Sequence, residues 1–312
     1  MTRPGSRARF RNLDGSGPNP ARDVFRWMIL DRLAGRRRKS AKTADVPFVE
    51  VDRAQLESEE PSIRLTWIGH ASWLVQLDGA SILVDPVFSD RLPGFILRNV
   101  PPALQPRELP RIDATLVTHS HYDHLDVRSV RAAGARIVAG SGMGRVLPGC
   151  RELGWWETER IRGDVRATFV PSQHWSRRGL RDTNRTLWGG FVIEGPSGTV
   201  YHSGDTAYFA GFADIGARFR GIDAALLPIG AYDPPWFMER QHMNPEQAVR
   251  AFLDLGARTF VAMHWGTFKL TDEPLEEPPQ RLRAEWQRRE LPEKALRIPA
   301  VGETFTVNDG LE

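Results

Sequence analysis

The chain has almost no cysteine and no long apolar run. Its 312 residues include one cysteine, Cys150, which excludes an internal disulfide framework and a cysteine-based zinc site. We therefore expect a reducing compartment and a cytoplasmic protein, with peripheral contact at a membrane as an open alternative. No uninterrupted apolar stretch approaches the length of a membrane span, and the arginine-containing N-terminus lacks the apolar segment of a secretory signal.

Neither sign of charge dominates the composition. There are 42 basic and 39 acidic residues, which give a net charge of +3, and hydrophobic residues make up 41% of the chain. These values are typical of a globular protein, and the length allows one large domain or two fused halves. RNA-recognition signatures, zinc-finger spacings and basic stripes interleaved with aromatics are missing, so no nucleic-acid partner is expected. The sequence does not indicate an oligomeric state.

The composition changes along the chain and suggests three parts. Residues 1–20 are rich in Gly, Pro, Asn and Arg and are predicted to be irregular. Residues 21–62 are predicted to form a helix and a basic linker, and residues 63–312 a compact domain. Periodicity favours packing of Phe25, Met28 and Ile29 on the core. The alternative is an amphipathic helix that rests, with the basic residues 36–39, on an anionic membrane.

Three histidines and a carboxylate lie within six positions of one another. They are His119, His121, Asp123 and His124. Neutral imidazole suits zinc and similar metals, and a carboxylate adds a harder oxygen ligand. An apolar, β-prone stretch over 112–118 precedes them, and Asp126 is a good N-cap for a helix that ends at Gly134. The spacing therefore predicts a metal-binding loop at the carboxyl end of a strand, with room for two adjacent ions.

Three more candidate ligands, His174, Asp205 and His264, each follow a predicted apolar strand. We predict strands over 63–68, 72–77, 82–84, 167–170, 191–194, 199–202, 223–229 and 258–263, and a helix that starts at Asn244 and ends at Gly256. This order is typical of a layered α/β domain with two sheets inside and helices outside. Seven ligands without thiolates suffice for two ions that share an aspartate and activate a water between them.

These motifs resemble the metallo-β-lactamase superfamily. Further stretches resemble its N-acyl phosphatidylethanolamine phospholipase D branch, over a region from Phe25 to Glu303. They are 66–71, 85–89, 171–175, 187–189, 228–232, 236–238, 241–242 and 264–268. The resemblance implies a four-layer αβ/βα sandwich with a dinuclear metal site at the edge of the sheets.

The resemblance also implies roles for single residues. His119, His121 and His174 would hold the first of two zinc ions, with iron or manganese as alternative metals. Asp123, His124 and His264 would hold the second, and Asp205 would bridge the two. Asp123 would also relay a proton as a catalytic residue, Asp85 would orient a ligating histidine, and His242 would contact the substrate. His70 and His202 are interpreted as structural.

The function implied is a dinuclear zinc hydrolase that cleaves a phosphodiester. The expected substrate is an N-acyl phosphatidylethanolamine-like phospholipid, cleaved in the manner of a phospholipase D. A lactonase or another carboxylic-ester or amide metallo-hydrolase is the first alternative, and a non-catalytic lipid- or metal-binding protein is the second. Two features stay open. Tryptophans 73, 175, 188, 236 and 265 serve either the core or an acyl groove, and arginines 177, 178, 181 and 185 either bind an anion or are solvated.

Overall fold

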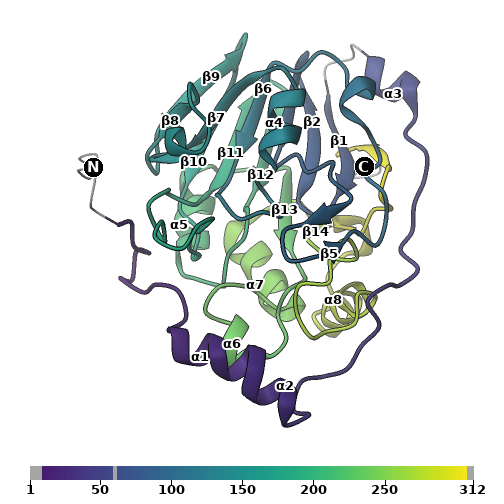
Figure 1. Ribbon diagram of the computed structural model, residues 1–312. Helices are drawn as coiled ribbons and strands as arrows, with labels where there is room; N and C mark the ends of the chain where they lie inside the picture. Colours follow the sequence, from purple (N-terminus) through teal and green to yellow (C-terminus); the bar gives the residue numbers. More distant parts are fainter. Residues whose placement is uncertain (1–8, 59–61, 308–312) are drawn as a thin grey trace.

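Two seven-stranded sheets form the centre of the molecule (Figure 1). The computed structural model describes residues 9–58 and 62–307. The first sheet has the order β16 (Thr304–Thr306), β1 (Ile63–Gly69), β2 (Ser72–Leu77), β3 (Ala80–Val84), β6 (Ala114–Val117), β7 (Arg136–Gly140) and β8 (Arg151–Leu153). The second has the order β15 (Leu296–Arg297), β14 (Thr259–Met263), β13 (Ala224–Pro228), β12 (Gly198–His202), β11 (Gly190–Gly195), β10 (Val165–Val170) and β9 (Thr158–Arg162).

Helices cover the outer faces of the sheets. They are α3 (Arg53–Glu57), α4 (Val127–Ala132), α5 (Gly211–Arg218), α6 (Pro235–Met238), α7 (Pro245–Leu255) and α8 (Glu277–Arg288). A helical segment near the N-terminus comprises α1 (Ala21–Phe25), the π-helical turn η1 (Arg26–Leu30) and α2 (Asp31–Leu33), and a small hairpin comprises β4 (Arg91–Leu92) and β5 (Ile96–Leu97). No helix within 9–58 or 62–307 is long and apolar enough to cross a membrane.

Strands β1, β2, β3 and β6 of the first sheet are buried along their whole length, so both of their faces are covered, because side chains alternate along a strand. In β1, Leu65 and Trp67 enter the large core between the sheets, whereas Ile68 joins a separate apolar cluster with Leu56 of α3. A third cluster lies under α4 and includes Val130. Two inner sheets with helices outside give the predicted four-layer sandwich, which the structure confirms.

The predicted helix starts are also confirmed. The side chain of Asp126 accepts a hydrogen bond from the backbone N–H of Arg128 at the start of α4. Asn244 and Gln247 form a capping box at the start of α7, and Gly256 ends that helix with a φ of 61°. These caps fix where each helix leaves its preceding loop, so they also position the loops at the edge of the sheets.

One prediction about the N-terminal helix is wrong. Phe25, Met28 and Ile29 do not pack on the core, since 55%, 51% and 43% of their surfaces are exposed. Trp27 faces the body of the protein instead, and its ring stacks on Phe237 with centroids 4.9 Å apart. Periodicity identified the apolar face of the helix, but it did not show which face packs against the protein. Trp27, on the other face, makes that contact.

Replacing Gly216 with alanine should destabilise the fold. Gly216 lies in α5 against the end of α7, and a Cβ there would be 2.4 Å from the carbonyl oxygen of Leu255. The helices must then separate, so Gly216→Ala should lower the free energy of unfolding by about 1–3 kcal/mol. Urea denaturation measures this. Gly17→Ala, with no atom within 4 Å of the new Cβ, is the control; equal losses in both variants would refute the close approach.

Candidate metal centre

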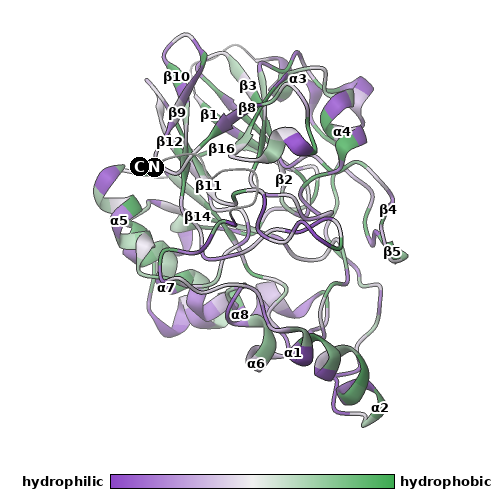
Figure 2. Cartoon of the chain, turned by 60° about the vertical axis from the view of Figure 1, so that its left-hand side comes forward, coloured by the Kyte–Doolittle hydropathy of each residue, from purple (hydrophilic) through white to green (hydrophobic). Residues whose placement is uncertain are grey.

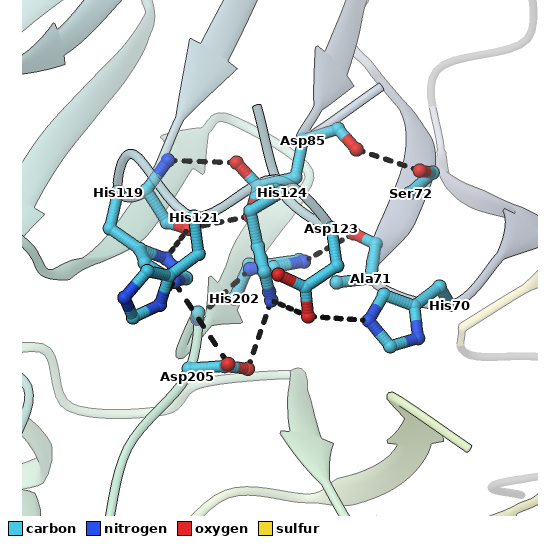
Figure 3. A network of polar contacts seen from close by, with 12 residues as sticks. His70, Ala71, Ser72, Asp85, His119, His121, Asp123, His124, His202 and Asp205 are labelled. Atoms are coloured by element: carbon cyan, nitrogen blue, oxygen red, sulfur yellow. Dashed lines mark hydrogen bonds and ion pairs between the residues drawn. The ribbon is translucent and has the colours of Figure 1, made fainter. Parts of the chain in front are cut away.

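All eight histidines of the chain gather at one edge of the two sheets. Figure 3 shows that His70, His202 and the histidines of the loop after β6 reach this edge from different segments. His119, His121 and His124 come from the loop between β6 and α4, together with Asp123. The others follow strands or turns: His70 after β1, His174 after β10, His202 at the end of β12, His242 after α6 and His264 after β14. The first of these loops lies where the sequence predicts it.

The first group of ring nitrogens is formed by His119, His121 and His174. Nδ1 of His121 lies 2.9 Å from Nε2 of His119 and 3.1 Å from Nε2 of His174. Ligands of a tetrahedral zinc, at about 2.0–2.1 Å from the ion, are separated by roughly 3.4 Å. The three nitrogens therefore converge as closely as ligands of one ion do.

The second group contains Asp123, His124, His264 and, in addition, His70. Oδ2 of Asp123 lies 3.5 Å from Nε2 of His264, 3.8 Å from Nε2 of His124 and 3.1 Å from Nε2 of His70. His70 was interpreted from the sequence as structural. Its position makes it a fourth polar partner of this group, and its φ of 56° turns the chain sharply after β1.

Asp205 lies between the two groups. Its Oδ1 is 3.1 Å from Nε2 of His124 and 3.0 Å from Nε2 of His264. Its Oδ2 faces the other way, 3.8 Å from Nε2 of His174 and 4.0 Å from Nε2 of His119. One carboxylate thus presents a different oxygen to each group, which is the arrangement of a bridging ligand.

Hydrogen bonds on the far side of the rings fix which nitrogen faces the cluster. Nδ1 of His124 donates to Oδ2 of Asp85 at 2.7 Å, and Nδ1 of His174 donates to the carbonyl of Gln241 at 2.9 Å. Asp85 is itself held by the backbone N–H and the hydroxyl of Thr118. Such outer partners orient metal-binding imidazoles and set their tautomers. The position of Asp85 agrees with the role that the resemblance implies.

The electrostatics differ between the two groups. Burial lowers the pKa of His119 and His174 well below the usual value and that of His121 to about 4, so these rings are neutral near pH 7. Burial also opposes the charged form of His264, but the carboxylates of Asp205 and Asp123 outweigh it and raise its pKa to about 9. Protons in the second group thus neutralise two buried carboxylates, a task that a cation can take over.

Several buried atoms of the cluster lack a hydrogen-bond partner. These include Nε2 of His121, Nε2 of His124, Nε2 of His264 and Oδ1 of Asp205. Burying such atoms without partners costs free energy, and most proteins avoid it. Imidazole and carboxylate donors without thiolates suit zinc, iron or manganese. The unpartnered atoms point into the cluster, so the residues present fit metal binding.

His242 and His202 differ in what their rings contact. Nδ1 of His242 has no hydrogen-bond partner and lies 3.8 Å from Oδ2 of Asp205, and the side chain is 14% exposed. Both ring nitrogens of His202 are used, since Nδ1 accepts from Gly204 N–H and Nε2 donates to the carbonyl of Ala71. His202 is therefore structural, as interpreted from the sequence, whereas His242 remains free to contact a ligand.

The structure decides part of what the sequence left open about tryptophan and arginine. Trp73, Trp188 and Trp265 are buried in the core between the sheets, and Trp265 also lines a small cavity beside His70 and His264. Arg178 is partly buried, and its Nη1 donates to the carbonyls of Ser120 and Leu125. It stabilises the loop that carries the first candidate ligands.

Sequence reasoning missed the N-terminal segment 9–20. Residues 1–8 of the region predicted to be irregular lie outside the described residues; residues 9–20 have no helix or strand, yet Asn12 is only 5% exposed. Its Oδ1 accepts hydrogen bonds from the backbone N–H of His174 (3.1 Å) and from Nε1 of Trp188 (2.9 Å). Asp14 also accepts from Nε2 of Gln173 at 2.7 Å. The segment therefore holds the loop of a candidate ligand, and nothing local in a Gly- and Pro-rich sequence signals this contact.

Replacing Asn12 should weaken both the fold and metal binding. Asn12→Leu leaves the backbone N–H of His174 without an acceptor, at about 1–3 kcal/mol in the free energy of unfolding, whereas Nε1 of Trp188 keeps the carbonyl of Ser172 at 3.0 Å. Metal affinity should fall about 10–100-fold, as for other outer partners of ligands. Asn12→Asp keeps an acceptor and should recover most of both. Denaturation with and without chelator measures these effects; unchanged stability and metal content in Asn12→Leu would contradict the assignment.

Comparison with known proteins places this geometry in a family. Residues 80–265 match the model of the beta-lactamase superfamily domain. An uncharacterized protein of Mycobacterium tuberculosis is 37% identical over 275 residues, which cover 82% of this chain and 72% of that protein. The N-acyl-phosphatidylethanolamine-hydrolyzing phospholipase D 1 of Caenorhabditis elegans is 33% identical over 275 residues, which cover 80% of this chain and 77% of the relative.

The fold has a counterpart among solved structures. A metallo hydrolase from the archaeon Ignicoccus hospitalis superposes with a TM-score of 0.61 at 24% sequence identity, over 78% of this chain and 98% of that one. At this identity the likeness concerns the fold alone. Together with the family match and the sequence relatives, it shows that the chain belongs to the metallo-β-lactamase superfamily of metal-dependent hydrolases, in its N-acyl phosphatidylethanolamine phospholipase D-like branch.

Proposed function

We propose that this protein is a dinuclear zinc hydrolase that cleaves a phosphodiester bond in a phospholipid. The position of Asp205 carries the proposal of two ions. Its two oxygens face separate groups of ring nitrogens, one around His121 and one around His264. A site for one ion would not require a buried carboxylate that divides its oxygens in this way.

The proposed ligands are those that the sequence suggests. His119, His121 and His174 would hold one ion, Asp123, His124 and His264 would hold the other, and Asp205 would lie between them. Two bound zinc ions would supply Lewis acidity and lower the pKa of a water held between them. Phosphoryl transfer needs such charge stabilisation, because negative charge spreads over the phosphate oxygens.

Two further side chains are suited to handle the proton and the substrate. Asp123 is buried except for 13% of its side chain, and Oδ2 is held by Nε2 of His70. We assign Asp123 to accept the proton of the attacking water and to return it to the leaving alcohol. His242, at the partly open side of the cluster, donates a hydrogen bond to a phosphate oxygen. Both are proposed as catalytic residues.

The proposed substrate is an N-acyl phosphatidylethanolamine-like lipid. Support comes from the relatives in Caenorhabditis elegans and Saccharomyces cerevisiae, whose names describe hydrolysis of this lipid by a phospholipase D. Cleavage would break the bond between phosphorus and the headgroup oxygen. The products would be phosphatidic acid and an N-acylethanolamine.

Replacing Asp205 with asparagine tests the two-ion site. Asn keeps the shape of the side chain but loses the charge that balances two cations, so Asp205→Asn should lower the metal content from about two equivalents to one or fewer and reduce hydrolysis by roughly two orders of magnitude or more. Elemental analysis and initial rates measure these effects. Asp254→Asn is the control, because its oxygen only accepts from Tyr208. A variant Asp205→Asn with two ions and full activity would refute the bridging role.

A panel of substrates tests the reaction class. Zinc-loaded protein is incubated with N-acyl phosphatidylethanolamine in mixed micelles, a lactone and a β-lactam, and products are identified by mass spectrometry. We expect phosphatidic acid from the lipid. Turnover of the carbonyl compounds alone would contradict phosphodiester cleavage and favour a lactonase or another ester or amide hydrolase. No turnover at full zinc loading would favour a binding protein.

A further inference from the structure

The N-terminal helical segment, made of α1, η1 and α2, carries apolar side chains on its outer face. Phe25, Met28, Ile29 and Leu33 are 55%, 51%, 43% and 82% exposed. Their spacing puts them on one side of a helix. In Figure 2 the segment protrudes at the lower edge of the molecule, with hydrophobic residues prominent near α2. Helices of globular proteins turn such a face inward, and within 9–58 and 62–307 nothing buries this one.

The opposite face of the segment is firmly attached. The ring of Trp27 stacks on Phe237, and its Nε1 donates to Oδ2 of Asp272 at 3.1 Å. Nε of Arg37 donates to Oδ1 of the same carboxylate at 2.9 Å. Asp31 is buried and forms an ion pair with Arg36 at 2.7 Å. The orientation of the segment is thus set by specific contacts, so the apolar face is held outward.

Basic residues surround the apolar face. Residues 21–39 contain seven basic and two acidic side chains, a net charge of +5, against +3 for the whole chain. Arg32 and Lys39 are exposed and form no ion pair with the residues that the structure describes. An apolar helix face flanked by lysine and arginine is typical of helices that lie in the interface of an anionic membrane.

The segment is connected to the candidate metal centre through α6. Phe237 and Trp236 of α6 contact Trp27 and Arg26, respectively. The chain then continues to His242, whose backbone N–H donates to the carbonyl of Met238. The segment is therefore linked through α6 to the loop that carries His242, whose side chain is partly open.

The β4–β5 hairpin forms a second apolar protrusion. The hairpin of β4 and β5 exposes Phe95 (87%) and Leu97 (69%). It is tied to the centre by Arg98, whose guanidinium lies over the ring of Phe268, and that ring contacts His70. Figure 2 shows the hairpin and α2 projecting from the same side of the molecule.

We propose that the segment α1–η1–α2 docks on an anionic lipid bilayer and holds the metal centre against it. The proposal deepens the proposed function and rests on it for one point, namely that the substrate is taken from a bilayer. Charge complementarity favours a bilayer over a second copy of this chain, because a symmetric contact would bring the basic residues of both copies together. The β4–β5 hairpin supplies a second apolar contact with the same surface.

Vesicle binding of the full chain tests the docking surface. Wild-type protein should float with phosphatidylcholine vesicles that contain about one third phosphatidylglycerol, and salt should weaken this binding. The variant Phe25→Gln/Met28→Gln/Ile29→Gln/Leu33→Gln should bind about tenfold or more weakly, since it loses the apolar contact. Glutamine is a good helix former, so the segment should persist. Arg32→Gln/Lys39→Gln should weaken binding about fivefold for each charge.

The controls separate this proposal from the proposed function. Leu253→Gln removes an exposed apolar side chain of α7 (41% exposed) and should leave vesicle binding unchanged. Bis(p-nitrophenyl) phosphate, which is soluble, should be hydrolysed equally by the wild type and the fourfold variant, while lipid in vesicles should be hydrolysed more slowly by the variant. Wild-type protein that binds vesicles but hydrolyses neither phosphodiester would overturn the proposed function alone. Absent wild-type binding, equal binding by the fourfold variant, or dimerisation through this face would overturn the docking surface.

Discussion

The structure depends on one constraint, which is the burial of polar atoms at the edge where the two sheets meet. Several ring nitrogens and a carboxylate oxygen there have no hydrogen-bond partner. Asp205 places this oxygen within 3.1 Å of two imidazole nitrogens, and only protons on these rings balance its charge. Burying polar groups destabilises the folded state unless another interaction offsets the cost. A bound cation would offset it, so metal binding and folding stability are coupled at this edge.

The surrounding protein keeps these groups in place from several directions. Asp85, after β3, orients His124 and is held by Thr118, after β6, so two neighbouring strands of the first sheet fix the position of one ring. The carbonyl of Gln241, after α6, orients His174. Both sheets and the N-terminal segment therefore contribute to one cluster. A shift of either sheet would change the distances between the candidate ligands.

The sequence predicted much of the fold and of the cluster, for a physical reason. Strands with apolar runs and capped helices have local signals, and ligands such as His264 directly follow such strands, so their convergence could be expected. Asn12 could not be found in this way, because its partner lies 162 residues away. The outward face of Phe25 was also missed, since periodicity shows that a helix has an apolar face but not that Trp27 anchors the other one.

The contact between Asn12 and His174 has a consequence for the order of assembly. Residue 12 leaves the ribosome long before residue 174 is made, so this contact closes a very long loop and is entropically expensive to form early. The two sheets can pair through nearer neighbours first. The N-terminal stretch would then dock last, and the histidine cluster would be completed in the final step of folding.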